Sequence, residues 1–147
     1  GRAPASELAR GAYVLSDPPD GDPEAIVIAT GSEVSIALEA QGMLAEEGIR
    51  ARVVSMPSWE IFEAQPTEYR DEVLPPSITA RVSVEAAASL GWERWVGDRG
   101  RIIAIDRFGA SAPGSTNLEK FGFTPERIAE AVRVVVGQPA AGEPAHA

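Results

Sequence analysis

The chain has 147 residues and a mass of 15.5 kDa, which is the size of one domain with a real hydrophobic core. A net charge of −9 at pH 7, with thirteen scattered lysines and arginines, argues against a nucleic-acid partner, and no apolar run approaches the ~20 residues of a membrane span. Cysteine is absent, which excludes disulfides and thiolate chemistry. The only histidine, His146, lies in a C-terminal stretch of Pro, Gly and Ala, where we do not expect it to be catalytic.

The first third of the sequence predicts two strands and a helix. Residues 1–10 resemble a linker, residues 12–15 a short strand, and the continuous apolar run at 25–29 a strand buried on both faces of a parallel sheet. Ser32 can cap the following helix, and Glu33 suits the positive end of its dipole. Apolar residues then recur at helical spacing until Gly48, which predicts the end of this helix.

The rest of the chain predicts three further strands and several helices. The strands are expected in the stretches IRARVVSMP, ITARVSVEA and RIIAID. Ser58 is expected to cap a short helix over 59–64, and QPTEYRDEVLPP to carry another turn or two before its prolines. Thr124, followed by a proline, predicts the start of a closing helix over 125–136.

This order of elements places the chain in the α/β class. Strands that alternate with helical segments predict βαβ units, helices on both faces and a largely parallel sheet. The loop between the first two strands is too short for a parallel crossover, so we expect one antiparallel strand.

Two loops are candidates for binding an anion. The turn ATGSEVS presents backbone N–H groups of Gly31 and Ser32 beyond the end of a strand, and DRFGASAPGS brings Gly109, Ala110 and Ser111 to a similar place. The first turn has one glycine and no lysine, and Glu33 would repel an anion, so an ordinary strand-to-helix turn is the favoured interpretation. For the second loop the favoured interpretation is a tight crossover against a neighbouring domain.

Catalytic and metal-binding groups are not predicted. VGDRGR has a superficial likeness to the metal-binding motif for thiamine diphosphate, with Asn117 downstream, but Arg99 replaces its glycine, and we interpret the stretch as a surface turn. Glu85 and Asp106 follow neighbouring strands without a histidine or nucleophile nearby, which favours solvated carboxylates. The tryptophans are expected to be packing anchors or interface residues; they are Trp59, Trp92 and Trp95.

Taken together, several stretches of the chain resemble the C-terminal domain of transketolase. They are RGAYVLSDP, IVIATGSEVSIALEA, RVVSMPSWEIFEAQ, YRDEVLPP, ARVSVEAA, GWERWVG, IDRFGASAP and FGFTPERI, in this order. SMPSWEIFEAQ and FGASAP with FGFT are specific to transketolase, whereas ATGSEV would also suit pyruvate dehydrogenase β-type subunits and deoxyxylulose phosphate synthase. The resemblance covers residues 10–136.

The resemblance implies a three-layer α/β/α sandwich with a five-stranded, mixed, mostly parallel sheet and one antiparallel strand. It places an interdomain linker at 1–10, the transketolase C-terminal domain at 11–137 and a flexible tail at 138–147. A full transketolase is a cytoplasmic homodimer of the pentose phosphate pathway that uses thiamine diphosphate and Mg²⁺ (or Ca²⁺). It transfers a two-carbon ketol unit from a ketose phosphate to an aldose phosphate.

Because the family's catalytic motifs belong to two preceding domains, which bind the thiamine and its pyrimidine, we assign no catalytic, cofactor or metal residue to this chain. We expect the isolated chain to be inactive, with no nucleic-acid or membrane partner. The first hypothesis is a non-catalytic assembly domain that docks on the preceding domains through exposed apolar patches. The second hypothesis is a regulatory module that binds an anion or nucleotide at one of the two candidate loops. The third, a free-standing enzyme, would need a site built from Asp, Glu and Ser.

Overall fold

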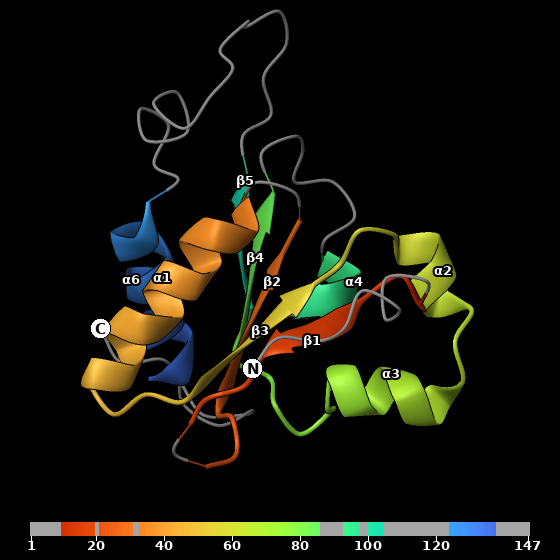
Figure 1. Ribbon diagram of the computed structural model, residues 1–147, viewed down its shortest axis with the longest axis horizontal. Helices are drawn as coiled ribbons and strands as arrows, with labels where there is room; N and C mark the ends of the chain where they lie inside the picture. The colour runs from red at the N-terminus through yellow and green to blue at the C-terminus, as the bar shows by residue number, and fades with distance from the viewer. Residues whose placement is uncertain are drawn as a thin grey trace, which may run out of the picture.

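The computed structural model describes residues 10–19, 21–30, 33–85, 93–97, 100–104 and 124–137. Five strands in these ranges form one mixed sheet in the order β1-β3-β2-β4-β5 (Figure 1). Their bounds are Tyr13–Ser16 for β1, Ala25–Ala29 for β2, Ala51–Ser55 for β3, Arg81–Glu85 for β4 and Arg101–Ala104 for β5. β1 is antiparallel to β3 and all other neighbours are parallel, which confirms the predicted α/β class with one antiparallel strand.

The helices cover both faces of this sheet. They are α1 (Glu33–Glu46), α2 (Trp59–Glu63), α3 (Thr67–Val73), α4 (Glu93–Val96) and α6 (Pro125–Val136). The long helices α1 and α6 lie together on one face, and α2, α3 and α4 lie on the other (Figure 1). The result is the expected three-layer sandwich.

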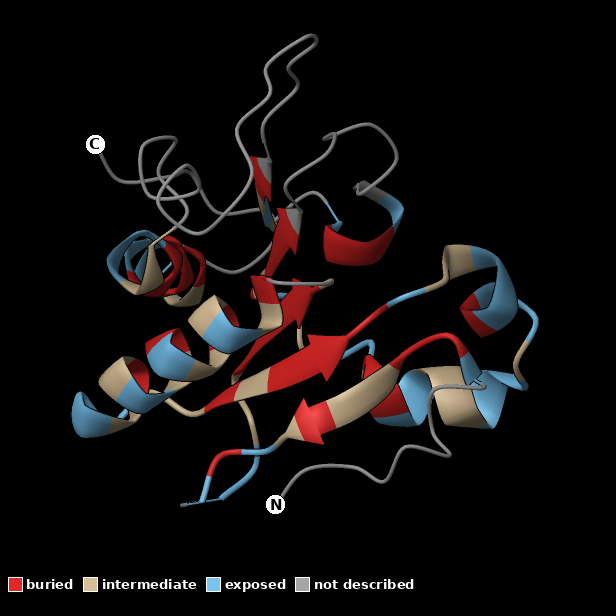
Figure 2. Cartoon of the chain, turned by 45° about the horizontal axis from the view of Figure 1, so that its top comes forward, coloured by how far each residue is buried: buried red, intermediate tan, exposed pale blue. Residues whose placement is uncertain are grey.

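The middle strand β2 is buried at every position because it has a neighbouring strand on each side and a helical layer on each face. Its side chains point alternately to the two faces of the sheet and belong to two separate apolar clusters. Val27 packs in the cluster under α1 and α6, whereas Ile26 and Ile28 pack in the cluster under α2, α3 and α4. Figure 2 shows this buried centre, with the exposed residues on the outer sides of the helices and in the connecting loops.

The helix ends follow the local chemistry expected from the sequence. The Oγ of Ser58 accepts a hydrogen bond from the backbone N–H of Ile61 (3.3 Å), and the Oγ1 of Thr124 accepts one from that of Arg127 (3.1 Å). Helix α1 ends before Gly48, whose φ of +81° suits glycine at this position.

Two features differ from the sequence-based expectation. The first strand begins at Tyr13, one residue later than predicted. Its neighbour in the sheet, for which the sequence made no prediction, is β3. The short helix α4 was not predicted, because a single turn is too short to show a helical period.

None of the described helices has the length and apolar character needed to cross a membrane.

Candidate functional site

The carboxyl edge of the sheet contains a topological switch point. From β2 the chain passes through α1 to β3 on one side, and from β4 it passes through α4 to β5 on the other side. β2 and β4 are direct neighbours, so the connections that leave their carboxyl ends diverge. Ligands of open α/β sheets bind in the crevice at such a point. The carboxyl end of β2, after which the first anion-binding candidate was predicted, is therefore located at the switch point.

Glu33 is the acidic residue that follows this candidate turn, at the start of α1. Its backbone N–H donates to the carbonyl of Thr30 (3.1 Å), and its side chain is buried at the first position of α1. A carboxylate in the first turn of a helix interacts favourably with the helix dipole. The two candidate anion-binding residues themselves, Gly31 and Ser32, lie outside the described residues.

The second candidate loop, with Gly109, Ala110 and Ser111, also lies outside the described residues, as do Asp106 and Asn117. It follows the carboxyl end of β5, the strand next to β4.

The stretch VGDRGR, which resembles the metal-binding motif for thiamine diphosphate, contains a turn before β5, as predicted. Gly97 has a φ of +74°, and the backbone N–H of Gly100 donates to the carbonyl of Gly97 (3.3 Å). The intervening residues 98–99 lie outside the described ranges. Within those ranges no group of three or more His, Asp or Glu side chains could hold a metal ion.

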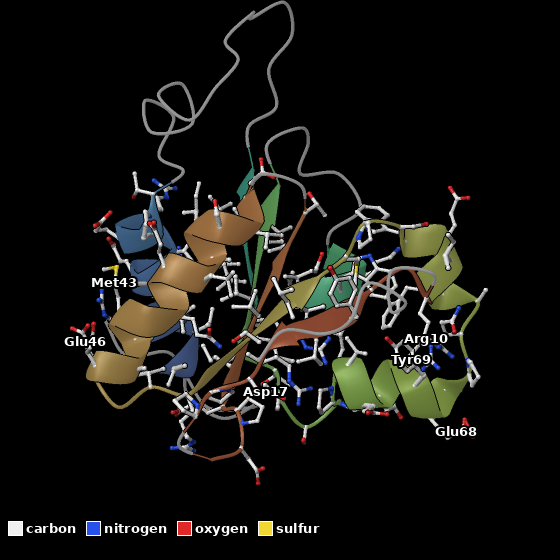
Figure 3. The ribbon with its side chains drawn as sticks, in the orientation of Figure 1. Arg10, Asp17, Met43, Glu46, Glu68 and Tyr69 are labelled. Carbon is white, nitrogen blue, oxygen red and sulfur yellow. The ribbon has the colours of Figure 1, made fainter. Side chains whose placement is uncertain are left out.

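The N-terminal segment is fixed against α2 and α3. The guanidinium of Arg10 lies 4.6 Å from the centre of the Tyr69 ring, and the Tyr69 hydroxyl donates to the carbonyl of Ala12 (2.8 Å) (Figure 3). The backbone N–H of Ser58 donates to the carbonyl of Gly11 (3.0 Å). The segment from Arg10 to Ala12 is therefore held by a cation–π contact and by hydrogen bonds to the α2 and α3 region.

The described surface does not show the apolar docking patch expected from the sequence. Its exposed large hydrophobic side chains are Ile61 and Val134, which belong to α2 and α6 on opposite faces of the sheet. Trp95 is buried with its ring centre 5.5 Å from that of Phe62, and Trp59 meets Trp95 edge-on at 6.4 Å. These two tryptophans are packing residues, and Trp92 lies outside the described part.

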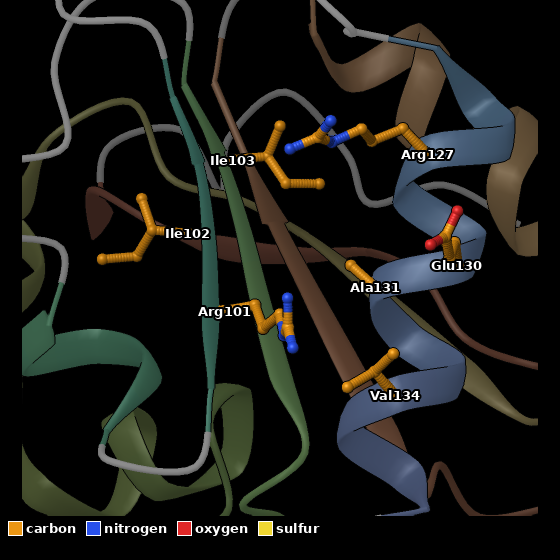
Figure 4. Close-up of a pocket in the computed structure, with 7 residues that line it drawn as sticks. All are labelled: Arg101, Ile102, Ile103, Arg127, Glu130, Ala131 and Val134. Carbon is orange, nitrogen blue, oxygen red and sulfur yellow. The ribbon is translucent and has the colours of Figure 1, made fainter.

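A groove of about 220 Å³ lies between the edge strand β5 and helix α6 (Figure 4). Its lining residues are Arg101, Ile102 and Ile103 of β5 and Arg127, Glu130, Ala131 and Val134 of α6. The α6 residues recur at i, i+3, i+4 and i+7 and thus share one face of the helix. The guanidinium groups of Arg101 and Arg127 both lie in the space between the strand and the helix (Figure 4).

This groove was not predicted from the sequence. The signal in the sequence was weak. It consists of Arg101, which precedes two isoleucines, and of Arg127, which lies 26 positions later at helical spacing from an alanine and a valine. That signal becomes meaningful only when β5 is known to be the last strand in the described part of the sheet, with α6 packed beside it.

Comparison with known proteins connects most of the chain to one family. A family model described as the transketolase-like C-terminal domain matches residues 11–124. The transketolase of Geobacillus stearothermophilus is 55% identical over 129 residues, which are 88% of this chain and 19% of the relative, and that of Mycobacterium tuberculosis H37Rv is 53% identical over 131 residues. The chain thus spans about a fifth of the length of these relatives.

Solved structures agree with this result. A transketolase structure from Leishmania mexicana matches with a TM-score of 0.80 and 38% identity over 97% of this chain, which corresponds to 20% of that protein. A transketolase structure from Pichia stipitis matches with a TM-score of 0.77 and 35% identity over 90% of this chain.

Proposed function

The chain belongs to the transketolase family, in which it corresponds to the C-terminal domain, and we propose from this that it is the non-catalytic, structural domain of a full-length transketolase. The observation that carries the proposal is the extent of the match: the C-terminal family model covers residues 11–124, and each relative is about five times longer than the matched segment. The division into a linker at 1–10, a domain at 11–137 and a tail at 138–147 is part of this proposal.

The proposed activity of the whole protein is transfer of a two-carbon ketol unit from a ketose phosphate to an aldose phosphate, in the pentose phosphate pathway of the cytoplasm. Thiamine diphosphate, held with a divalent metal, supplies the carbon–carbon bond chemistry in such an enzyme. The donors of this chain do not fit that group: its only histidine is His146, and the stretch VGDRGR carries Arg99 where the motif needs glycine. We therefore assign the cofactor, its metal and the homodimer's active sites to the preceding domains.

The contacts at the N-terminus support a role in assembly. A linker that entered a freely tethered domain would need no fixed position on its surface. Here the segment from Arg10 to Ala12 is bound to α2 and α3 by the contacts described above, so the direction from which a preceding domain reaches this one is restricted.

A transketolase assay with three proteins tests the proposal: this chain alone, the preceding domains alone, and the two joined in one polypeptide. All three are assayed with ketose and aldose phosphates, thiamine diphosphate and Mg²⁺. We expect turnover by the joined protein and none by this chain.

The protein without this domain separates a structural from a catalytic role. A structural role predicts lower thermal stability or weaker dimerisation, with an unchanged KM for thiamine diphosphate in whatever fraction remains assembled. Turnover by this chain alone would overturn the proposal, as would a stable dimer of the preceding domains that has lost only kcat.

A regulatory anion site at the carboxyl edge is the second candidate function, and the switch point between β2 and β4 is the observation that favours it. An NMR titration of this chain with phosphate, sugar phosphates and nucleotides tests it. Saturable shifts of the amides from Thr30 to Glu33, or from Gly109 to Ser111, are the expected result, and unmoved amides at both loops would exclude it.

A further inference from the structure

Most arginines that the structure describes have a partner. The carboxylate partners are Glu24 for Arg50, Asp17 for Arg52, Glu63 for Arg94 and Glu47 for Arg133. Arg10 lies over the Tyr69 ring, and Arg70 and Arg81 donate to backbone carbonyls. This pairing is expected in a chain with nine more negative than positive charges, because a surplus of carboxylates is available to every cation.

Arg101 and Arg127 are the exceptions within the described part of the chain. Neither guanidinium has a hydrogen bond or an ion pair with another described residue, both side chains are exposed, and both line the groove between β5 and α6. Two cations on opposite walls of one groove repel each other unless an anion lies between them. Glu130 is the carboxylate in the lining, and no ion pair joins it to either arginine.

The groove also has an apolar part. Ile103 and Ala131 form buried walls, and Val134 is 38% exposed at the same helix face. A volume of about 220 Å³ is below the range of roughly 300–1,000 Å³ that holds drug-sized ligands, so the groove suits a smaller molecule.

We propose that this groove is a binding site for a small organic anion, a carboxylate or a phosphate ester with a short carbon body. Arg101 and Arg127 hold the oxyanion through charge-assisted hydrogen bonds, for which the guanidinium fork is well shaped. The carbon body lies over Ile103, Ala131 and Val134. Glu130 lowers the affinity for dianions and accepts from a hydroxyl or amine on the ligand. This inference does not depend on the role proposed above for the domain.

The test is an NMR titration of the 147-residue chain with three probes at constant ionic strength: inorganic phosphate, glycerol 3-phosphate and glutarate. The reporters are the Nε–H signals of the arginines and the methyl signals of Ile103 and Val134. We expect saturable shifts at these reporters, with tighter binding of a probe that carries carbon atoms than of inorganic phosphate. Comparison of glycerol 3-phosphate with glutarate separates the phosphate from the carboxylate source.

Charge variants of the groove sharpen the test. Arg101→Gln and Arg127→Gln are each expected to weaken binding about tenfold, which equals about 1.4 kcal/mol. Glu130→Gln is expected to strengthen it, because it removes the groove's carboxylate. The matched control is Arg94→Gln, which removes the same charge from an exposed side chain of α4 outside the groove lining and is expected to leave the affinity within about twofold.

Three results would overturn the proposal: shifts that rise without saturation, equal losses in all three arginine variants, and unchanged reporters. The exposed positions of these side chains make unfolding of the variants a small risk, and amide spectra of each variant without ligand check it. Saturation at Thr30 to Glu33 with unmoved groove reporters would assign anion binding to the sheet edge and exclude the groove.

Discussion

Gly11 is the residue at which backbone geometry and packing together leave no alternative to glycine. Its φ is +84°, and a Cβ built on it would lie 2.4 Å from the backbone N of Phe62 and 2.6 Å from the carbonyl O of Ser58. Both neighbours belong to the backbone of the α2 region and cannot move aside cheaply. The glycine therefore allows the N-terminal segment to lie directly on α2.

We predict that Gly11→Ala destabilises the chain by about 2 kcal/mol or more, from a left-handed φ and a backbone clash. Urea unfolding followed by circular dichroism measures it. The control is Gly42→Ala in α1, where nothing lies within 4 Å of the added Cβ, and which should stabilise the helix by about 0.5–1 kcal/mol. Equal effects of the two substitutions would contradict the role given to Gly11.

Arg81 connects three elements through its guanidinium. It donates to the carbonyls of Ile78 (2.9 Å), Pro75 (2.9 Å), Leu74 (3.3 Å) and Trp95 (2.7 Å). Burial lowers the pKa of Arg81, which reflects the cost of desolvating a cation, and the four carbonyl acceptors offset that cost. The side chain thus joins the end of α3, the start of β4 and helix α4.

We predict that Arg81→Met costs about 2–4 kcal/mol, because it leaves these carbonyls without a donor. Arg81→Lys keeps the charge but lacks the planar fork, so it should recover only part of the loss. Denaturant unfolding of the three proteins at one pH measures both effects. A methionine variant within about 0.5 kcal/mol of the parent would show that the carbonyls find other donors.

At the scale of the elements, an ion pair joins α6 to the turn that follows α1. The Nε of Arg133, in the last turn of α6, donates to Oε1 of Glu47 (2.8 Å), the residue directly after α1. The hydrogen bond from Arg133 lowers the pKa of Glu47 below its ordinary value of 4.5, and the same bond raises the pKa of Arg133. Because the folded-state pKa of Glu47 is the lower one, its contribution to stability is present above pH 4.5 and is lost as pH falls through the lowered value.

We therefore predict that Glu47→Gln lowers the urea midpoint slightly at neutral pH and that the difference from the parent vanishes below the folded-state pKa. The effect is small because both side chains are solvent-exposed. Glu46→Gln, next in sequence and without an ion pair in the described structure, is the control. A difference that persisted unchanged into acid would mean that the ion pair is not its cause.

The elements differ in how far the sequence alone could predict them. β2, α1 and α6 were predictable because each has a strong local signal: a continuous apolar run, a glycine stop, and a threonine cap followed by proline. The partner of β1 was not, since strand pairing depends on contacts distant in sequence. The same reason explains why the arginine groove was missed: Arg101 and Arg127 line the same groove only because of the sheet order and the packing of α6.

At the scale of the whole molecule, the two apolar clusters share one sheet. Neighbouring residues of β2 and β3 point alternately into the cluster under α1 and α6 and into the one under α2, α3 and α4. Loss of either helical layer would expose one face of the central strands to water and weaken the other face as well. We therefore expect the chain to unfold as one cooperative unit, independently of any preceding domain.

Two optical probes and one substitution, made in a Trp92→Phe background, test this prediction. The fluorescence of the remaining Trp59 and Trp95 reports on the α2–α4 face. Among the described helices, the two long ones on the opposite face, α1 and α6, contribute most of the far-ultraviolet circular dichroism. Leu44→Ala removes a fully buried side chain of α1 and should cost about 2–5 kcal/mol. Although Leu44 lies on the far side of the sheet from both tryptophans, we expect the fluorescence and dichroism transitions to shift together and to coincide. A fluorescence midpoint that stayed in place while the dichroism midpoint fell would show that the two layers unfold separately, and that the domain depends on its neighbours for its cooperativity.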